Sequence, residues 1–185
     1  MIIAPCATGG GSRRESGLKG LNGCARVSIR MIPLPPDFKD FLLLLNANGI
    51  RYLVIGGYAV AFHGYVRHTG DLDVFVELSV ENAEKLTRAL RQFGFDLPRV
   101  KPALFLQKGK IIRMGYEPTR LEILNEIDGV SFQECYRRRR VADLDGLKIN
   151  FIALPQLLKN KRASRRLKDL ADVEALDPGK RSHKQ

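Results

Sequence analysis

Two adjacent glycines stand where the chain could hold a phosphate group. Gly56 and Gly57 follow residues 52–55, an apolar run long enough for one buried strand, and precede residues 58–62, which predict a short helix. A glycine turn between a strand and a helix places backbone N–H groups beside a helix N-terminus, and this arrangement suits a phosphate. The plainer interpretation is a tight turn without a ligand.

Two aspartates follow the glycines after a thirteen-residue spacer, residues 58–70. Asp71 and Asp73 lead into the apolar run 74–76. Residues two apart on a strand project from the same face, so these aspartates would present paired carboxylates. A phosphate-binding turn followed by paired carboxylates indicates metal-dependent chemistry on a nucleoside triphosphate. The plainer interpretation makes Asp71 part of a turn and Asp73 an exposed strand residue.

The segments around these residues predict the elements that must position them. Asp37 is expected to cap a helix over 38–48, and Ser79 is expected to cap a helix that ends at Gly94. Strands are expected at 103–107, 111–115 and 120–124, a helix from Ser131 through the arginine run 137–140, a hairpin at Asp145-Gly146, and two helices at about 155–163 and 167–176.

A third acidic residue lies within the predicted strand 120–124. Glu122 stands between two branched apolar neighbours and points to the opposite face from them. A carboxylate in that position is costly unless it is exposed, paired or bound to a metal. A surface glutamate on an edge strand is the alternative. Glu126 and Asp128 are poorer candidates, because they lie further along near a predicted turn.

The histidines do not supply a general base. His63 stands on the apolar short helix, where a packed or capping role is expected, and His68 lies in a predicted loop. We assign neither to the site.

Charge is distributed unevenly along the 185 residues, whose net charge is +11. Residues 1–30 carry five basic residues against one acidic, residues 31–130 carry twelve of each, and residues 131–185 carry fourteen against seven. The last segment, at net +7, indicates either a solvated face or a polyanionic partner. No apolar run approaches the ~20 residues of a membrane span, so no membrane partner is expected.

The cysteines and the first residues favour a cytoplasmic location. Cys6, Cys24 and Cys135 are an odd number at wide spacing, which is typical of reduced thiols, and they do not combine with histidines at a zinc-like spacing. The start of the chain lacks the basic and hydrophobic regions of a secretory signal.

The domain organisation follows from composition. Residues 1–30 are rich in glycine, serine and arginine without apolar periodicity, and they predict a disordered extension, with a misassigned start as an alternative explanation. One domain is expected over 31–177, followed by a basic tail over 178–185.

The order of these motifs resembles the signature of the nucleotidyltransferase (polymerase beta-like) superfamily: Gly-Gly, a thirteen-residue spacer, then Asp-Leu-Asp and apolar residues. Residues 127–132, 160–163 and 168–172 resemble small bacterial nucleotidyltransferase-like proteins, including abortive-infection toxin-type members. The resemblance covers roughly 38–177. Residues 165–167, Arg-Arg-Leu, depart from the Gly-Arg-Pro expected there, which puts that turn between helices in doubt.

The resemblance implies an α/β (α+β) fold with a small mixed sheet flanked by helices. It also implies transfer of a nucleoside monophosphate from an NTP to a hydroxyl acceptor, with release of pyrophosphate. Arg67 and Thr69 are added because they lie close in sequence to the motif. The expected catalytic and metal-binding residues are Asp71, Asp73 and Glu122, with two Mg²⁺ ions, and the expected nucleotide-binding residues are Gly56, Gly57, Arg67, Thr69 and Lys161.

Two questions stay open at the level of sequence. The basic run 137–140 and the cluster 159–168 are more than a triphosphate needs, so RNA is the favoured acceptor, with a protein or small-molecule hydroxyl as the alternative. The rival function is a non-enzymatic toxin or antitoxin component that keeps the fold and acts by binding a partner. Three retained carboxylates favour the enzyme.

Overall fold

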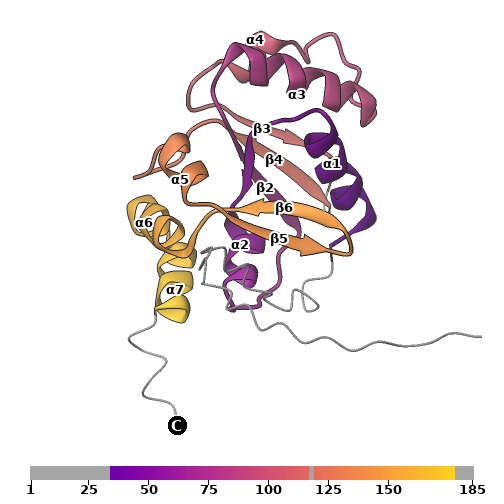
Figure 1. The fold of residues 1–185 in the computed structure, drawn as a ribbon. Coiled ribbons are helices and arrows are strands. Elements are labelled where there is room, and N and C mark those ends of the chain that lie inside the picture. Colours follow the sequence, from indigo (N-terminus) through magenta and orange to yellow (C-terminus); the bar gives the residue numbers. More distant parts are fainter. Residues whose placement is uncertain (1–33, 117–118, 178–185) are drawn as a thin grey trace, which may run out of the picture.

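The computed structural model describes residues 34–116 and 119–177 (Figure 1). The predicted disordered extension, 1–30, and the predicted basic tail, 178–185, lie outside the described residues. The helices are α1 (Pro36–Ala47), α2 (Gly56–Phe62), α3 (Val80–Gln92), α4 (Pro102–Phe105), α5 (Phe132–Arg137), α6 (Leu154–Ser164) and α7 (Leu167–Leu176). The strands are β1 (Tyr52–Val54), β2 (Asp71–Val76), β3 (Ile111–Met114), β4 (Arg120–Leu124), β5 (Arg140–Leu144) and β6 (Leu147–Phe151).

The strands form one mixed sheet in the order β3-β4-β2-β1-β6-β5. β2 runs parallel to β4 and antiparallel to β1, while β1 runs parallel to β6. The two outer pairs, β3 with β4 and β5 with β6, are antiparallel. The expected α/β fold with a mixed sheet and flanking helices is confirmed, and β4 is an inner strand rather than an edge strand.

Helices pack on both sides of the sheet (Figure 1). α1 packs against the end of α3, where the rings of Phe41 and Phe93 lie 5.3 Å apart. On the other side α5 brings Phe132 to 5.2 Å from Phe75 of β2. α6 and α7 lie beyond α5 on that side. None of the helices in the described ranges is both long and apolar enough to cross a membrane.

The strand predicted over 103–107 is wrong. Pro102 instead begins the short helix α4, because proline at a first helical position lacks only an N–H that would be unpaired anyway. The side chain of Asn125 donates to the carbonyls of Phe105 at 2.8 Å and Gln107 at 2.9 Å, which holds this segment compact. The strand predicted over 111–115 is confirmed as β3.

Two helix boundaries also differ from prediction. α1 begins at Pro36 after Pro35, so Asp37 lies in its first turn and is not the cap. α5 does begin after Ser131, whose hydroxyl accepts from the backbone of Glu134, but it ends at Arg137. Arg140 pairs with Phe151 in the β5–β6 ladder, because hairpin pairing competes with helix extension there.

Candidate active site

Pairing of β2 with β4 brings the predicted carboxylates together. In the parallel register Asp71 stands opposite Arg120, and Asp73 stands opposite Glu122. Burial alternates along β4 and along the first four residues of β2, so these four residues share one partly open face. Their apolar neighbours in sequence, such as Leu72, are buried on the opposite face.

The glycine turn lies against this face. Gly56 has φ +59°, and a Cβ atom built on it would lie 1.8 Å from Oδ2 of Asp73. A Cβ on Gly57 would lie 2.4 Å from Oγ1 of Thr69. A side chain at either position would collide with its neighbour, and at Gly56 the left-handed backbone favours glycine as well. Both glycines belong to the first turn of α2, two residues earlier than the predicted helix start.

The surroundings of Asp73 disfavour its charged form. Burial, followed by the charges of Glu122 and Asp71, raises the pKa of Asp73 to about 6. A backbone hydrogen bond from Gly57 and the charge of Lys161 act in the opposite direction. A nearby cation would therefore favour the charged form of this carboxylate.

Two arginines that the sequence analysis did not assign hold the other carboxylates. Nε of Arg113, on β3, donates to Oε1 of Glu122 at 2.7 Å. A terminal nitrogen of Arg120 donates to Oδ2 of Asp71 at 2.8 Å and lies 3.5 Å from Oε1 of Glu122. Strand parity could have found Arg120, two residues before Glu122. Arg113 could be found only from the β3–β4 register.

The donor set fits a hard divalent cation. Carboxylate oxygens are the ligands that Mg²⁺ prefers, and the guanidinium of Arg120 already marks a place for positive charge between Asp71 and Glu122. Within residues 34–116 and 119–177, however, no three His, Cys, Asp or Glu side chains converge on a point as they stand. Binding an ion on all three carboxylates therefore requires these side chains to move.

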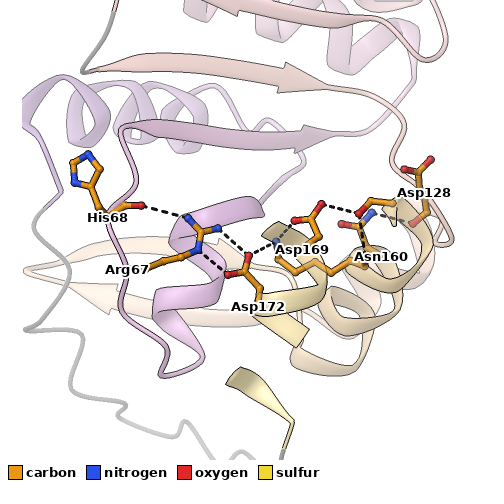
Figure 2. Close-up of polar contacts among 8 residues, drawn as sticks. Arg67, His68, Asp128, Asn160, Asp169 and Asp172 are labelled. Carbon is orange, nitrogen blue, oxygen red and sulfur yellow. Dashed lines mark hydrogen bonds and ion pairs between the residues drawn. The ribbon is translucent and has the colours of Figure 1, made fainter. Parts of the chain in front are cut away.

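An ionic network includes Arg67, Asp169 and Asp172 (Figure 2), and the buried Lys161 joins it. Its ammonium contacts Oδ1 of Asp169 at 2.6 Å and Oδ2 of Asp172 at 2.8 Å, and its side chain is only 4 % exposed. Arg67 donates two hydrogen bonds to Asp172, at 2.7 and 2.8 Å, and so joins the loop before β2 to α7. Ser164 donates to Asp169 at 2.6 Å. The charges of Lys161 and Arg67 are thus already matched within the protein.

The carboxylates in this network are stabilised in their charged form. Burial opposes ionisation of Asp172, but hydrogen bonds from Arg67 and Lys161 outweigh it and lower its pKa. Burial likewise opposes ionisation of Asp169, and hydrogen bonds from Lys161 and Ser164 lower its pKa. Removing the charge of Arg67 or Lys161 would leave a buried carboxylate without one of its ion-pair partners.

The carboxylate face and the ionic network border one cleft of ≈ 510 Å³. Arg166 and Lys168, which the sequence analysis did not assign to the site, also line it and are exposed. Asn160 of α6 donates to the carbonyl of Asp128 at 2.9 Å, which fixes the loop after β4 at the rim (Figure 2). All the predicted site residues line this cleft: Gly56, Gly57, Arg67, Thr69, Asp71, Asp73, Glu122 and Lys161.

Another hollow, of ≈ 720 Å³, lies between α1 and the end of α3 and contains none of these residues. Its lining lacks converging catalytic groups, so the smaller cleft is the better candidate. Neither histidine considered in the sequence enters the site: Nε2 of His63 lies 2.8 Å from the carbonyl of Ile152, and burial lowers its pKa. The packed role expected for His63 is confirmed.

Comparison with solved structures addresses the fold. A Thermotoga maritima protein described as a candidate nucleotidyltransferase superposes with a TM-score of 0.50 and 14% identity, over 83% of this chain and 99% of that one. The fold is nucleotidyltransferase-like. An antigenic nucleotidyltransferase-like protein from Paracoccidioides brasiliensis also matches, with a TM-score of 0.47 and 17% identity over 80% of this chain and 78% of that one. No family model and no curated protein matches the sequence.

Proposed function

We propose that this protein is a Mg²⁺-dependent nucleotidyltransferase that moves a nucleoside monophosphate from an NTP to a hydroxyl acceptor. The observation that carries the proposal is the single cleft in which a glycine turn, three carboxylates and exposed basic residues meet. The nucleotidyltransferase-like fold supports the same class of reaction. The superfamily resemblance of the sequence motifs points the same way.

The reaction exchanges one bond to phosphorus for another. The acceptor oxygen bonds to the α-phosphorus, the bond from that phosphorus to the bridging oxygen breaks, and pyrophosphate leaves. Asp71, Asp73 and Glu122 would hold two Mg²⁺ ions, whose charge would stabilise the attacking and leaving oxygens. Glu122 binds the acceptor hydroxyl and takes its proton.

The triphosphate lies across the cleft from the glycine turn toward α7. The absence of side chains at Gly56 and Gly57 lets Asp73 and Thr69 pack against the turn, and backbone N–H groups of the turn bind the phosphates. Arg166 and Lys168, both exposed at the cleft, hold the β- and γ-phosphates. Lys161 positions Arg166 and Lys168 indirectly, because its ion pair with Asp169 fixes α6 against α7. Arg67 and Thr69 line the cleft beside the glycine turn.

RNA is the acceptor that the charge distribution favours. Arg137, Arg138 and Arg140 are exposed at the junction of α5 and β5, where they can contact a phosphate backbone. Arg139 is excluded from this role, because it donates to Asn150 at 3.0 Å and to the carbonyl of Tyr136 at 2.8 Å. The proposal places the reaction in the cytoplasm, which suits the buried free thiol of Cys135.

One observation favours a second candidate, a non-enzymatic toxin or antitoxin-type protein that acts by binding a partner. Asp71 and Glu122 are both paired with arginines, so the carboxylate face is satisfied without a metal. In that case the cleft would serve as a polar docking surface. The two candidates differ in whether nucleotide is consumed.

The deciding experiment is label transfer. The protein is incubated with each α-³²P-labelled NTP, Mg²⁺ and total RNA or protein, and the labelled macromolecule is identified. Wild type should transfer label, Asp73→Asn should lose at least about a hundredfold in rate, and Asp96→Asn, which changes an exposed carboxylate, should behave as wild type. Failure of wild type to label any macromolecule, or equal labelling by Asp73→Asn, would favour the binding protein.

A further inference from the structure

Arg120 occupies a position that no function yet explains. It begins β4, directly opposite Asp71 in the parallel register, and its side chain is 30 % exposed. One of its terminal nitrogens lies 2.8 Å from Oδ2 of Asp71 and 3.5 Å from Oε1 of Glu122. Its guanidinium therefore bridges two strands at the carboxylates that the proposed metal site would use.

Arg113 differs from Arg120 in each of these respects. It comes from β3, its side chain is 58 % exposed, and its Nε contacts Oε1 of Glu122 at 2.7 Å. A solvated ion pair of this kind contributes little, because water screens it. The two arginines thus form a natural pair for comparison, one between the carboxylates and one outside them.

The charges explain why a cation is needed at this point. Asp71, Asp73 and Glu122 would carry three negative charges on adjacent strands, and like charges held together raise the free energy of the folded protein. A guanidinium can donate to two carboxylates from a fixed planar fork, which a single point charge does less well.

We propose that Arg120 is the internal counter-cation of the carboxylate face, and that it must withdraw from Asp71 and Glu122 before a divalent cation binds there. This inference rests on the proposed metal-dependent function. Arg120 and the ion compete for the same oxygens, so the arginine lowers the apparent affinity for metal. It is a positioning residue, which keeps the strands paired and the carboxylates in place when no ion is bound.

The competition is tested by direct metal binding to the full chain without nucleotide. Mn²⁺ binding is measured by electron paramagnetic resonance at constant ionic strength for wild type, Arg120→Gln and Arg113→Gln. Arg120→Gln should bind Mn²⁺ about ten- to a hundredfold more tightly, the size of effect expected when a charge within a few Å is removed. Arg113→Gln should change the affinity less than about fivefold.

Two further variants keep the test decisive. Arg120→Lys retains the charge but loses the fork, so it should bind Mn²⁺ with an affinity between those of wild type and Arg120→Gln; it also serves if Arg120→Gln does not fold. Adding Asp73→Asn to Arg120→Gln should abolish the gain, which locates the ion on the carboxylate face.

The outcomes separate this inference from the proposed function. If wild type binds Mn²⁺ in a manner lost in Asp73→Asn, yet Arg120→Gln and Arg120→Lys bind no more tightly, Arg120 does not compete and the metal site stands. If wild type and every Arg120 variant fail to bind Mn²⁺ at millimolar concentration, the metal site and the competition are both wrong.

Discussion

Replacing Gly56 by alanine is the sharpest test of how the glycine turn and Asp73 depend on each other. The backbone of Gly56 has φ +59°, and a Cβ there would lie 1.8 Å from Oδ2 of Asp73. Gly49, just after α1, has φ +60° and no atom within 4 Å of the corresponding position. The two substitutions therefore impose the same backbone strain but differ in the collision with Asp73.

The structure sets the size of each effect. An alanine in the left-handed region costs about 1–2 kcal/mol, and Gly49→Ala should lower the free energy of unfolding by that amount alone. Gly56→Ala must also push the Asp73 carboxylate away by more than 1 Å, since Cβ contacts below 3.0 Å essentially never occur. Overpacking of this kind adds about 1–3 kcal/mol, for a total of about 2–5 kcal/mol.

Urea unfolding measures the free energy of unfolding. The rise in melting temperature on addition of Mg²⁺ and an NTP measures ligand binding at the candidate site. Ligands that bind only the folded state raise its stability, so wild type and Gly49→Ala should both show a gain. Gly56→Ala should lose that gain because Asp73 is displaced. Equal stability and equal metal-dependent gain in the two variants would refute the reasoning, since the collision would then have no consequence.

Three other predictions concern the buried network, the titration of Asp73 and the basic surface. Lys161→Met removes the ammonium shared by two buried carboxylates and should cost about 3 kcal/mol in urea unfolding, whereas the exposed Lys168→Ala should cost less than about 0.5 kcal/mol and instead weaken triphosphate binding. If Lys161→Met were as stable as wild type and lost only triphosphate affinity, its ammonium would be a free phosphate ligand. The pKa of Asp73 in the folded protein, about 6, lies above its ordinary value of 3.8, so the folded state binds more protons between these values and stability falls as pH rises through them. In EDTA, Asp73→Asn should therefore be as stable as wild type near pH 3.5 and more stable by about 3 kcal/mol at pH 7; a difference that does not vary with pH would contradict this. In tRNA binding measured against salt, Arg138→Ala should reduce the slope of log K by about 0.7–0.9, and Arg139→Ala should leave the slope unchanged. Loss of the same slope in both variants would indicate a general effect on the fold.

Sequence periodicity determined the faces of the central strands. A period of two places Asp71 and Asp73 on one face of their strand, and Leu72, Val74 and Val76 on the other, whatever the strands pair with. The same parity places Glu122 on a face of its own strand away from its branched neighbours. These assignments are local, because they depend only on the geometry of an extended chain.

The register of the sheet decided which of these faces meet. The parallel pairing that sets Asp73 opposite Glu122 joins segments about fifty residues apart, and no local pattern specifies it. The same pairing delivers Arg120 to Asp71, and the β3–β4 ladder delivers Arg113 to Glu122. Strand parity places Arg120 on the face of Glu122, but its pairing with Asp71, and the whole contribution of Arg113, depend on the order and register of the strands.

Helix packing decided the role of Lys161. The charged residues around it are also typical of a helix exposed to solvent, and the superfamily resemblance predicted that Lys161 binds phosphate. In the fold, the left-handed backbone at Arg165 ends α6 and turns α7 back against it, so that Asp169 and Asp172 both reach the Lys161 ammonium. The sequence by itself determined which face of its own strand each carboxylate takes and where the glycine turn lies, because strand parity and glycine turns are local. Only the tertiary structure decided which of their charges are already matched, because that depends on partners brought from distant elements.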